Sequence, residues 1–294
     1  MEFFGSYTAL ATPWTGDGSR IDYQALKDLV DWQIESGTDG LIAAGTTGES
    51  ATMTHPEQEE LIARVVGFAA GRRPVLAGAG SNNTAESTTL ARVAASAGAD
   101  ALLVITPYYN RPTQEGLYRH FAAIAEVSPL PIMIYNVPSR TGVNLLPETV
   151  GRIHRDFPQV NLIKEASGDV HQIDLLLRTI PGVRVFSGDD SLTFPTLALG
   201  GAGVVSVIAN LVPRENSLMV AAALAGDFAA AREWHRRLGP LTRACFLETN
   251  PGPVKAALRM MGKCSGRLRL PLVEPGPECE EAVRAALREI GLPG

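Results

Sequence analysis

Lysine is scarce in this chain, and one lysine occupies a position suited to covalent chemistry. The 26 basic residues include only four lysines, Lys27, Lys164, Lys255 and Lys263. Lys164 closes the mainly apolar run 160–163. Burial can make a lysine amine neutral and able to attack a carbonyl carbon, whereas an arginine keeps its proton. Lowering the lysine pKa from ~10.4 to ~7 costs about 4 to 5 kcal/mol, which a desolvated pocket can impose. An ion pair of Lys164 with Glu165 or Asp189 is the alternative, and position and scarcity leave both open.

Three loop segments carry groups suited to an anionic substrate. Residues 45–50, Gly-Thr-Thr-Gly-Glu-Ser, offer backbone N–H groups and hydroxyls to a small carboxylate, although such a cluster also marks an ordinary turn. Residues 135–142 supply the phenol of Tyr135 for proton transfer and the guanidinium of Arg140 for a carboxylate. The alternative is a Pro turn with a core tyrosine and a surface arginine. Residues 108–112, Tyr-Tyr-Asn-Arg-Pro, could equally belong to a catalytic site or to a subunit interface.

Other motifs argue against metal and nucleotide chemistry. The five histidines show no close ligand spacing, and no Cys and His pair has zinc-finger spacing, so we expect no metal. The segment 45–50 lacks P-loop spacing. The dinucleotide fingerprint is incomplete after Gly78-Ala79-Gly80. A nicotinamide enzyme is therefore not expected.

Eight short β-rich runs alternate with amphipathic stretches, and these elements must position the polar segments. The runs are 7–12, 40–44, 75–79, 101–106, 131–135, 160–164, 183–187 and 204–208. The stretches 22–35, 56–70, 85–97 and 113–126 are each long enough for a crossover helix. We predict the α/β class and a (β/α)₈ TIM barrel, with an open doubly wound sheet as the alternative. In a barrel, Lys164 lies at the C-terminal mouth of the sixth strand, where active sites are built.

The alternation stops after about residue 225. Helical patterns follow at 228–247, 253–261 and 279–290, with no long linker before them. We therefore predict a catalytic barrel, 1–225, and a C-terminal helical extension, 226–294, packed on it.

Composition indicates a globular protein of the cytoplasm. The chain of 294 residues is 45% hydrophobic and 19% charged, with a net charge of -5, which gives no basic bias for nucleic acid. Three cysteines without C-x-x-C spacing fit a reducing compartment. Residues 1–12 lack a basic leader region, and no apolar stretch approaches the roughly 20 residues needed to cross a bilayer. We expect no export and no membrane span.

Taken in order, the motifs resemble the dihydrodipicolinate synthase family within the N-acetylneuraminate lyase superfamily, almost end to end. They are Gly5-Ser6 with Thr12-Pro13, GTTGES (45–50), YYNRP (108–112), YNVPSRTG (135–142), IKEASGD (163–169), SGDD (187–190), GVVSVIAN (203–210), ETNPGPVKAAL (248–258) and LRLPL (268–272). Several specific motifs in order are far stronger than any one alone.

The resemblance implies an aldol condensation of pyruvate with L-aspartate 4-semialdehyde, which gives 4-hydroxy-tetrahydrodipicolinate for lysine and diaminopimelate biosynthesis. Lys164 would form an imine with pyruvate, and this covalent imine would replace any other cofactor. Thr46 and Thr47 would hold the pyruvate carboxylate. Tyr135 would shuttle protons through Thr46 to Tyr109, which in this family enters from the neighbouring subunit.

The resemblance also implies the rest of the site and the assembly. Arg140 would hold the carboxylate of the semialdehyde, and Gly188 with the backbone of Val205 would wall the imine. The family's usual assembly is a homotetramer built as a dimer of dimers. Some members bind L-lysine as an inhibitor at a dimer interface, and the matching positions are Ser50, Ala51, His55, Gln58, Asn82, Glu86 and Tyr108. Strongly inhibited members often carry histidine where this chain has Gln58, so we expect weak or absent inhibition. Ordinary polar interface residues are the alternative.

Two other functions compete with the synthase. One is another lysine-dependent pyruvate aldolase, which cleaves sialic acid or a 2-oxo-3-deoxy sugar acid. Arg140 argues against it, because sugar-acid lyases do not usually place an arginine there. The other is a non-catalytic binding protein that keeps the barrel. The joint retention of Lys164, Tyr135, Tyr109 and Thr46 argues against this second function.

Overall fold

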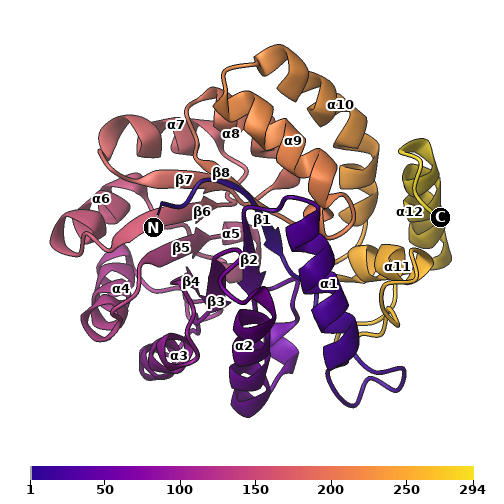
Figure 1. Cartoon of the computed structure of the whole chain (residues 1–294). Helices are drawn as coiled ribbons and strands as arrows, with labels where there is room; N and C mark the ends of the chain where they lie inside the picture. Colours follow the sequence, from indigo (N-terminus) through magenta and orange to yellow (C-terminus); the bar gives the residue numbers. More distant parts are fainter. Residues whose placement is uncertain (1) are drawn as a thin grey trace.

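Eight parallel strands close into a barrel in the computed structural model, which describes residues 2–294 (Figure 1). Met1, the first residue of the predicted barrel segment, lies outside the described residues. The strands are β1 Gly5–Ala9, β2 Gly40–Ala43, β3 Val75–Gly78, β4 Ala101–Ile105, β5 Ile132–Asn136, β6 Val160–Glu165, β7 Arg184–Ser187 and β8 Gly203–Ser206. Each strand pairs with its sequence neighbours, and β1 pairs with β8. The closed order confirms the predicted barrel and rules out the open sheet.

Helices surround the barrel and connect its strands. They are α1 Tyr23–Glu35, α2 His55–Ala69, α3 Thr84–Ser96, α4 Gln114–Val127, α5 Pro138–Thr141, α6 Pro147–Asp156, α7 Val170–Thr179, α8 Thr193–Ala198 and α9 Pro213–Leu224. Short 3₁₀ turns occur at η1 Ser50–Thr52, η2 Asp190–Leu192 and η3 Ile208–Asn210. Several helix starts follow from local sequence, because an N-cap side chain satisfies otherwise unpaired backbone N–H groups. Asp22 caps α1, and Thr54 and Glu57 form a capping box on α2.

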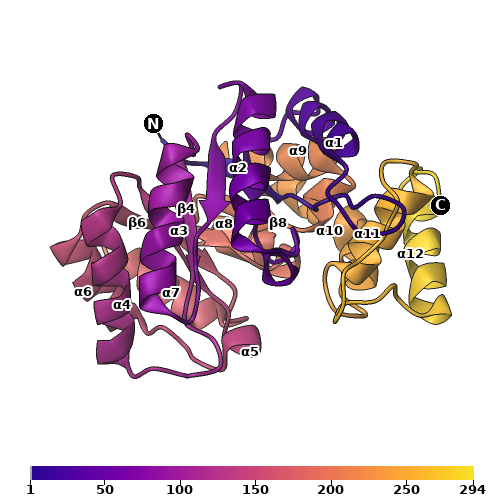
Figure 2. The same ribbon diagram turned by 90° about the horizontal axis from the view of Figure 1, so that it is seen from below.

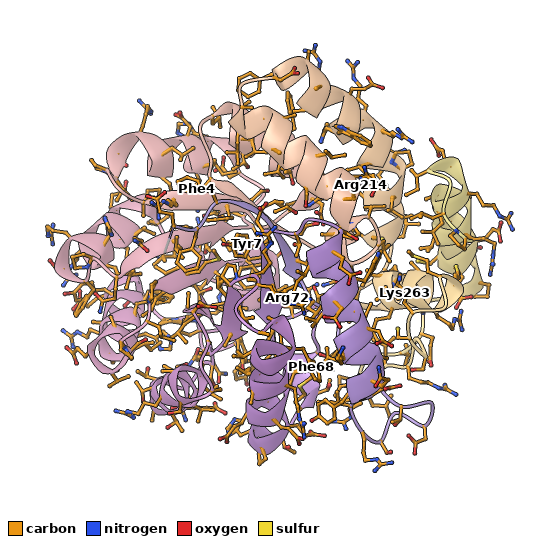
Figure 3. The ribbon with its side chains drawn as sticks, viewed as in Figure 1. Phe4, Tyr7, Phe68, Arg72, Arg214 and Lys263 are labelled. Carbon is orange, nitrogen blue, oxygen red and sulfur yellow. The ribbon has the colours of Figure 1, made fainter. Side chains whose placement is uncertain are left out.

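Apolar side chains divide between the inside of the barrel and the layer under the helices. Tyr7, Ile42, Leu162 and Phe186 belong to the inner cluster. Tyr7 lies edge-on to Phe186 with ring centroids 5.4 Å apart, and it sits near the centre of the ring of strands in Figure 3. The larger cluster joins the outer faces of the strands to the helices. The inner packing fills the barrel, as alternating side chains of a closed parallel sheet require.

Two strands end more than one residue earlier than the sequence indicated, because side chains take over their backbone hydrogen bonds. The run 7–12 is strand only to Ala9, where β1 ends, and the N–H of Ala11 donates to Asn210 Oδ1 at 2.9 Å. The run 204–208 is strand only to Ser206, since the N–H groups of Val207 and Ile208 donate to the Asp190 carboxylate. Polar groups distant in sequence therefore end both strands.

Three further helices follow the barrel, α10 Phe228–Cys245, α11 Gly252–Met260 and α12 Pro277–Glu289. α10 packs against α8 and α9, and α12 packs against α10 and α11. Figure 2 shows α11 and α12 beside the barrel at one edge of the molecule. The helical extension is thus confirmed, while the division at residue 225 stays a prediction. Among residues 2–294, no helix is long and apolar enough to cross a membrane.

Candidate active site

Lys164 and Tyr135 are neighbours across two adjacent strands. Residue pairing between β5 and β6 places Tyr135 opposite Lys164, with Asn136 opposite Glu165 one position further on. The Lys164 Nζ atom lies 4.1 Å from the centre of the Tyr135 ring. Both side chains are at the C-terminal ends of their strands, the end at which barrel enzymes carry their chemistry.

The surroundings of Lys164 favour a neutral amine. Its side chain is 5% exposed, and no carboxylate of residues 2–294 lies within ion-pair distance of it. Burial lowers the pKa of Lys164 to about 7, because desolvation penalises the ammonium form. The charge of Asp190 opposes this shift, and that of Arg140 adds to it. An amine with this pKa is partly unprotonated at neutral pH and can act as a nucleophile.

Neither carboxylate considered as an ion-pair partner binds Lys164. Glu165 accepts hydrogen bonds from Asn136 Nδ2, from Gln172 Nε2 at 3.0 Å and from the N–H of Ser167 at 2.7 Å. Asp189 instead caps η2, accepting from the backbone N–H and hydroxyl of Ser191. The ion-pair alternative is therefore wrong.

Tyr135 is buried, with Arg140 and Thr46 nearby. Burial raises the pKa of the Tyr135 phenol, while the Arg140 charge and the neighbouring Thr46 side chain act in the opposite direction. The phenol consequently keeps its proton and can donate it. Tyr135 also packs in the inner apolar cluster, so its role in proton transfer stays a prediction.

The Gly-Thr-Thr-Gly-Glu-Ser loop leaves β2 and reaches the same mouth. Thr46 lines the cleft, and Thr47 is buried beside Asn250, whose Nδ2 atom donates to Thr47 Oγ1 at 3.0 Å. Glu49 adopts a left-handed conformation with φ 59°. The loop therefore brings the Thr46 side chain to the cleft, while the adjacent Thr47 hydroxyl is held by Asn250.

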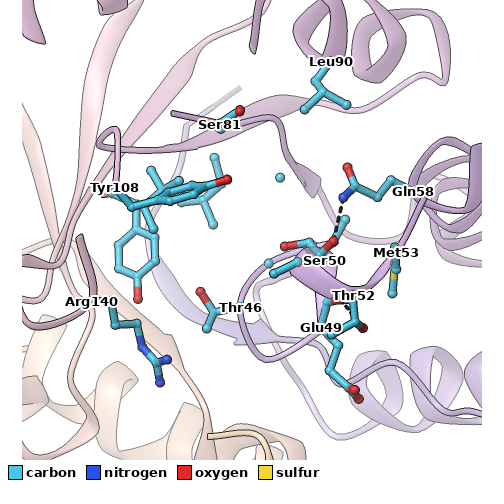
Figure 4. Close-up of a pocket in the computed structure, with 18 of the residues that line it drawn as sticks. Thr46, Glu49, Ser50, Thr52, Met53, Gln58, Ser81, Leu90, Tyr108 and Arg140 are labelled. Atoms are coloured by element: carbon cyan, nitrogen blue, oxygen red, sulfur yellow. Dashed lines mark hydrogen bonds between the residues drawn. The ribbon is translucent and has the colours of Figure 1, made fainter. Parts of the chain in front are cut away.

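Arg140 reaches the opposite wall of this cleft from the short helix α5. It is exposed and forms no ion pair within residues 2–294. The cleft has a volume of about 480 Å³ and is lined by Thr46, Tyr135 and Arg140 among others. In Figure 4, Arg140 lies at one side of the cleft and Ser50 and Gln58 at the other, with Thr46 between them. An unpaired guanidinium at a cleft wall suits recognition of a substrate carboxylate.

Gly188, directly after β7, lies beside Lys164, and Val205 of β8 faces the barrel interior. A Cβ atom added at Gly188 would lie 2.7 Å from Ala166 Cβ and 3.0 Å from Lys164 Cγ. A larger residue there would therefore displace the lysine. Val205 is buried in the barrel interior with Tyr135.

Tyr109 does not reach the cleft of its own chain. Its side chain is 89% exposed, and its backbone has a φ of 71°. The Tyr109 N–H donates to the Thr141 carbonyl at 3.3 Å, which ties the loop to the segment that carries Arg140. Tyr108 is exposed and lines the cleft. The single chain brings together Lys164, Tyr135 and Thr46 but leaves Tyr109 on the surface.

Most of the predicted effector positions line the same cleft. They are Ser50, Ala51, His55, Gln58, Glu86 and Tyr108, whereas Asn82 is not among the lining residues. His55 Nε2 lies 2.5 Å from Glu86 Oε1, and Gln58 Nε2 donates to the Ser50 carbonyl at 2.8 Å. The Asn82 carbonyl accepts from Asn110 Nδ2 at 2.9 Å. The set is thus brought together except for the Asn82 side chain.

Two residues of the site were missed from the sequence. Asp190 is buried near Lys164, and burial raises its pKa to about 6 although Ser206 and two backbone N–H groups hydrogen-bond to it. Asn250 comes from the C-terminal extension and binds Thr47. Asp190 lies in the SGDD motif and Asn250 in the ETNPGPVKAAL motif. These family motifs were the sequence signal that could have identified both residues.

A closed barrel with a desolvated lysine beside a phenol at its C-terminal mouth defines the class of lysine-dependent aldolases. The model of the dihydrodipicolinate synthetase family matches residues 2–290. The chain belongs to this family.

Individual relatives match over nearly their whole length. The 4-hydroxy-tetrahydrodipicolinate synthase of Oleidesulfovibrio alaskensis is 50% identical over 293 residues, which cover 99% of this chain and 100% of the relative. The solved dihydrodipicolinate synthase of Aquifex aeolicus is 44% identical, with a TM-score of 0.97 and 99% of both chains covered. The enzyme from Cyanidioschyzon merolae, solved with lysine bound, is 41% identical, with a TM-score of 0.96 and coverage of 99% of this chain and 100% of that one.

Proposed function

We propose that this enzyme condenses pyruvate with L-aspartate 4-semialdehyde to 4-hydroxy-tetrahydrodipicolinate through an imine on Lys164. The observation that carries the mechanism is the buried, unpaired Lys164, with a pKa lowered to about 7 and its amine 4.1 Å from the Tyr135 ring. The relatives' shared name supports the reaction. Its product belongs to lysine and diaminopimelate biosynthesis.

The first half of the reaction activates pyruvate. The neutral Lys164 amine attacks the C2 carbonyl, and loss of water leaves a protonated imine. Thr46 and Thr47 hold the pyruvate carboxylate with hydroxyl and backbone N–H donors. The imine withdraws electrons, so a methyl proton leaves and an enamine forms. No metal or separate cofactor takes part in these steps.

The second half forms the carbon–carbon bond. The enamine carbon attacks the aldehyde of the semialdehyde while the Tyr135 phenol donates a proton to the new alkoxide. Arg140 holds the semialdehyde carboxylate. The substrate amine then attacks the imine carbon, and cyclisation releases the product and regenerates Lys164. Gly188 and Val205 enclose the imine, and Tyr135 recovers its proton through Thr46 and the Tyr109 phenol of a neighbouring subunit.

A homotetramer, built as a dimer of dimers, supplies that second subunit. Exposed apolar side chains support it, because such surfaces are typical of interfaces. Tyr109 and Leu270 are almost fully exposed near the mouth of the cleft. Val170 and Leu199, from α7 and the end of α8, are exposed elsewhere on the molecule. We place the enzyme in the cytoplasm, which suits its three free cysteines.

Feedback by L-lysine is assigned to the outer half of the cleft. The Cyanidioschyzon merolae structure is a relative solved with lysine bound. Glu86 and His55 offer an acid and an imidazole to an amino acid, and Ser50, Ala51, Asn82 and Tyr108 are the other contacts proposed. The Gln58 amide already donates a hydrogen bond to the Ser50 carbonyl, which supports weak inhibition by L-lysine.

One assay separates this synthase from a lyase of the same superfamily. Purified enzyme is given pyruvate with L-aspartate semialdehyde, and in parallel sialic acid or 2-oxo-3-deoxy sugar acids. We expect condensation with the semialdehyde and no measurable cleavage of the sugar acids. Efficient sugar-acid cleavage without condensation would overturn the proposal.

A further inference from the structure

Asn250 joins the C-terminal extension to the substrate cleft. It lies between α10 and α11, is 5% exposed and lines the cleft that contains Thr46, Tyr135 and Arg140. Its Nδ2 atom donates to Thr47 Oγ1 at 3.0 Å, across 203 positions of sequence. Its Oδ1 atom is buried and has no hydrogen-bond partner. A buried amide of this kind has no role in the steps described above.

The bond from Asn250 determines what the Thr47 hydroxyl can do. A hydroxyl has one proton to donate and two lone pairs that accept. Because the Asn250 amide group fills one lone pair, the Thr47 proton is not used by Asn250 and stays free for another acceptor. A carboxylate is a strong acceptor for such a donor. Without Asn250, the hydroxyl would rotate freely and spend part of its time pointing elsewhere.

A second group of contacts fixes the other side of the same loop. Lys255 of α11 donates to Glu49 Oε1 at 2.5 Å and to the Thr12 carbonyl at 2.9 Å. The Arg269 N–H donates to Glu49 Oε2 at 3.1 Å. The Lys255 and Glu49 side chains are both fully buried. The extension therefore holds the loop at Thr47 and again two residues later.

We propose that Asn250 is a positioning residue that aims the Thr47 hydroxyl at the pyruvate carboxylate, so that the C-terminal extension completes the pyruvate site. This inference rests on the proposed function, which supplies pyruvate as the ligand. The extension then acts in substrate binding as well as in covering the barrel.

Two substitutions at Asn250 give different predicted effects. Asn250→Ala releases the hydroxyl, and the loss of one charge-assisted contact raises the KM for pyruvate about tenfold. Asn250→Asp has nearly the same shape but accepts the Thr47 proton and adds a negative charge near the substrate carboxylate. It therefore raises the KM for pyruvate further than Asn250→Ala. The KM for the semialdehyde changes little in either variant. If the alanine variant does not fold, the isosteric aspartate variant carries the test.

A double-mutant cycle with Thr47→Val isolates the coupling. Thr47→Val removes the hydroxyl, so adding Asn250→Ala to it leaves the KM for pyruvate unchanged. Asn216 is the matched control, because its buried Nδ2 atom donates to the Ser6 hydroxyl at 2.8 Å, away from the cleft, and its Oδ1 also lacks a partner. Asn216→Ala lowers the melting temperature and leaves the KM for pyruvate at its original value.

Independent effects of the two substitutions on this KM, or an unchanged KM in Asn250→Ala, would overturn the inference. Borohydride trapping separates such a failure from failure of the proposed function. Labelling of Lys164 at saturating pyruvate in the Asn250 variants leaves the imine mechanism intact whatever their KM. Absence of labelling in the unaltered enzyme counts against the mechanism itself.

Discussion

Two lysines are buried in this chain, and their surroundings indicate a structural role for one and a nucleophilic role for the other. Lys255 is fully buried against Glu49, with the charged atoms 2.5 Å apart. Lys164 is nearly as buried but has no ion pair within residues 2–294. Desolvation lowers the pKa of both, and for Lys255 the Glu49 charge opposes the shift. The paired ammonium of Lys255 stabilises the fold, whereas the unpaired amine of Lys164, with a pKa of about 7, can attack a carbonyl carbon.

The pH dependence of imine formation tests this assignment of Lys164. Only the neutral amine attacks, so the rate rises with pH through about 7 and then levels off. Asp190→Asn removes a charge that favours the ammonium form, so the apparent pKa moves down in that variant. Rapid-quench trapping with pyruvate at a series of pH values measures both effects. A rate that does not vary between about pH 6 and pH 9 contradicts the assignment.

The role of Arg140 is tested by measuring the effect of its substitution on each substrate separately. Arg140→Ala lowers the efficiency with the semialdehyde by roughly ten- to a hundredfold, the usual cost of losing a contact between charged groups. Pyruvate-dependent imine formation survives, because Lys164 and Tyr135 are unaltered. Arg119→Ala, on the exposed face of α4, serves as the control. Normal steady-state constants for both substrates in the Arg140 variant would refute its role.

At the scale of elements, local sequence was enough for the strands and for most helix starts. Apolar runs and capping residues are local signals, and all eight predicted runs contain strands. The ends of β1 and β8 were not predictable, because Asn210 and Asp190 terminate them through contacts with distant segments. The pattern alone also left the barrel and the open sheet unresolved, since closure depends on the pairing of β1 with β8.

In the candidate site, too, some features were predictable from local sequence and others depend on contacts between distant segments. Lys164 was recognisable because its residue type is rare and it closes an apolar run. The choice between a nucleophile and an ion pair was not predictable, since it depends on where the Glu165 side chain points. Glu165 turns to Asn136 and Gln172. Asn250 meets Thr47 across 203 positions, a contact that no local pattern encodes.

The buried ion pair between α11 and the loop after β2 has a measurable energetic signature. Lys255→Met leaves Glu49 buried without its partner and destabilises the protein by about 3 to 5 kcal/mol. Adding Glu49→Gln removes the stranded charge and keeps an acceptor for the Trp14 indole, so the double variant recovers part of that loss. Urea unfolding measures both. Lys27→Met breaks an exposed pair with Asp31 and changes stability by less than about 1 kcal/mol. Equal stability of the single and double variants would contradict this account.

At the scale of the whole molecule, one cleft is lined by Thr46, Tyr135 and Arg140 and also by most of the proposed effector positions. The effector groups that line the cleft come from η1, α2, α3 and the loop after β4, while the catalytic pair comes from β5 and β6. Tyr109 is presented outward from the same loop after β4. In the proposed tetramer, a neighbouring subunit that covers this loop would therefore contact both regions.

Inhibition by L-lysine tests the effector half of the cleft. Gln58 offers a neutral amide that is already bonded to the Ser50 carbonyl, so we expect weak or absent inhibition. Gln58→His restores an imidazole and strengthens the inhibition measured in steady-state assays. Half-inhibition of the unaltered enzyme at low micromolar L-lysine contradicts the prediction. If that inhibition persisted in Glu86→Ala, the site itself would be misplaced.

Reduction of the enzyme with borohydride in the presence of pyruvate tests the central claim most directly, because it fixes the substrate carbons to the amine that formed the imine. Peptide mass spectrometry then identifies the labelled lysine. The chain provides its own control, since Lys255 is also buried but is paired with Glu49. We predict pyruvate-dependent labelling of Lys164 alone, and none in Lys164→Ala. Labelling of another lysine, or no labelling of active enzyme, would contradict the mechanism.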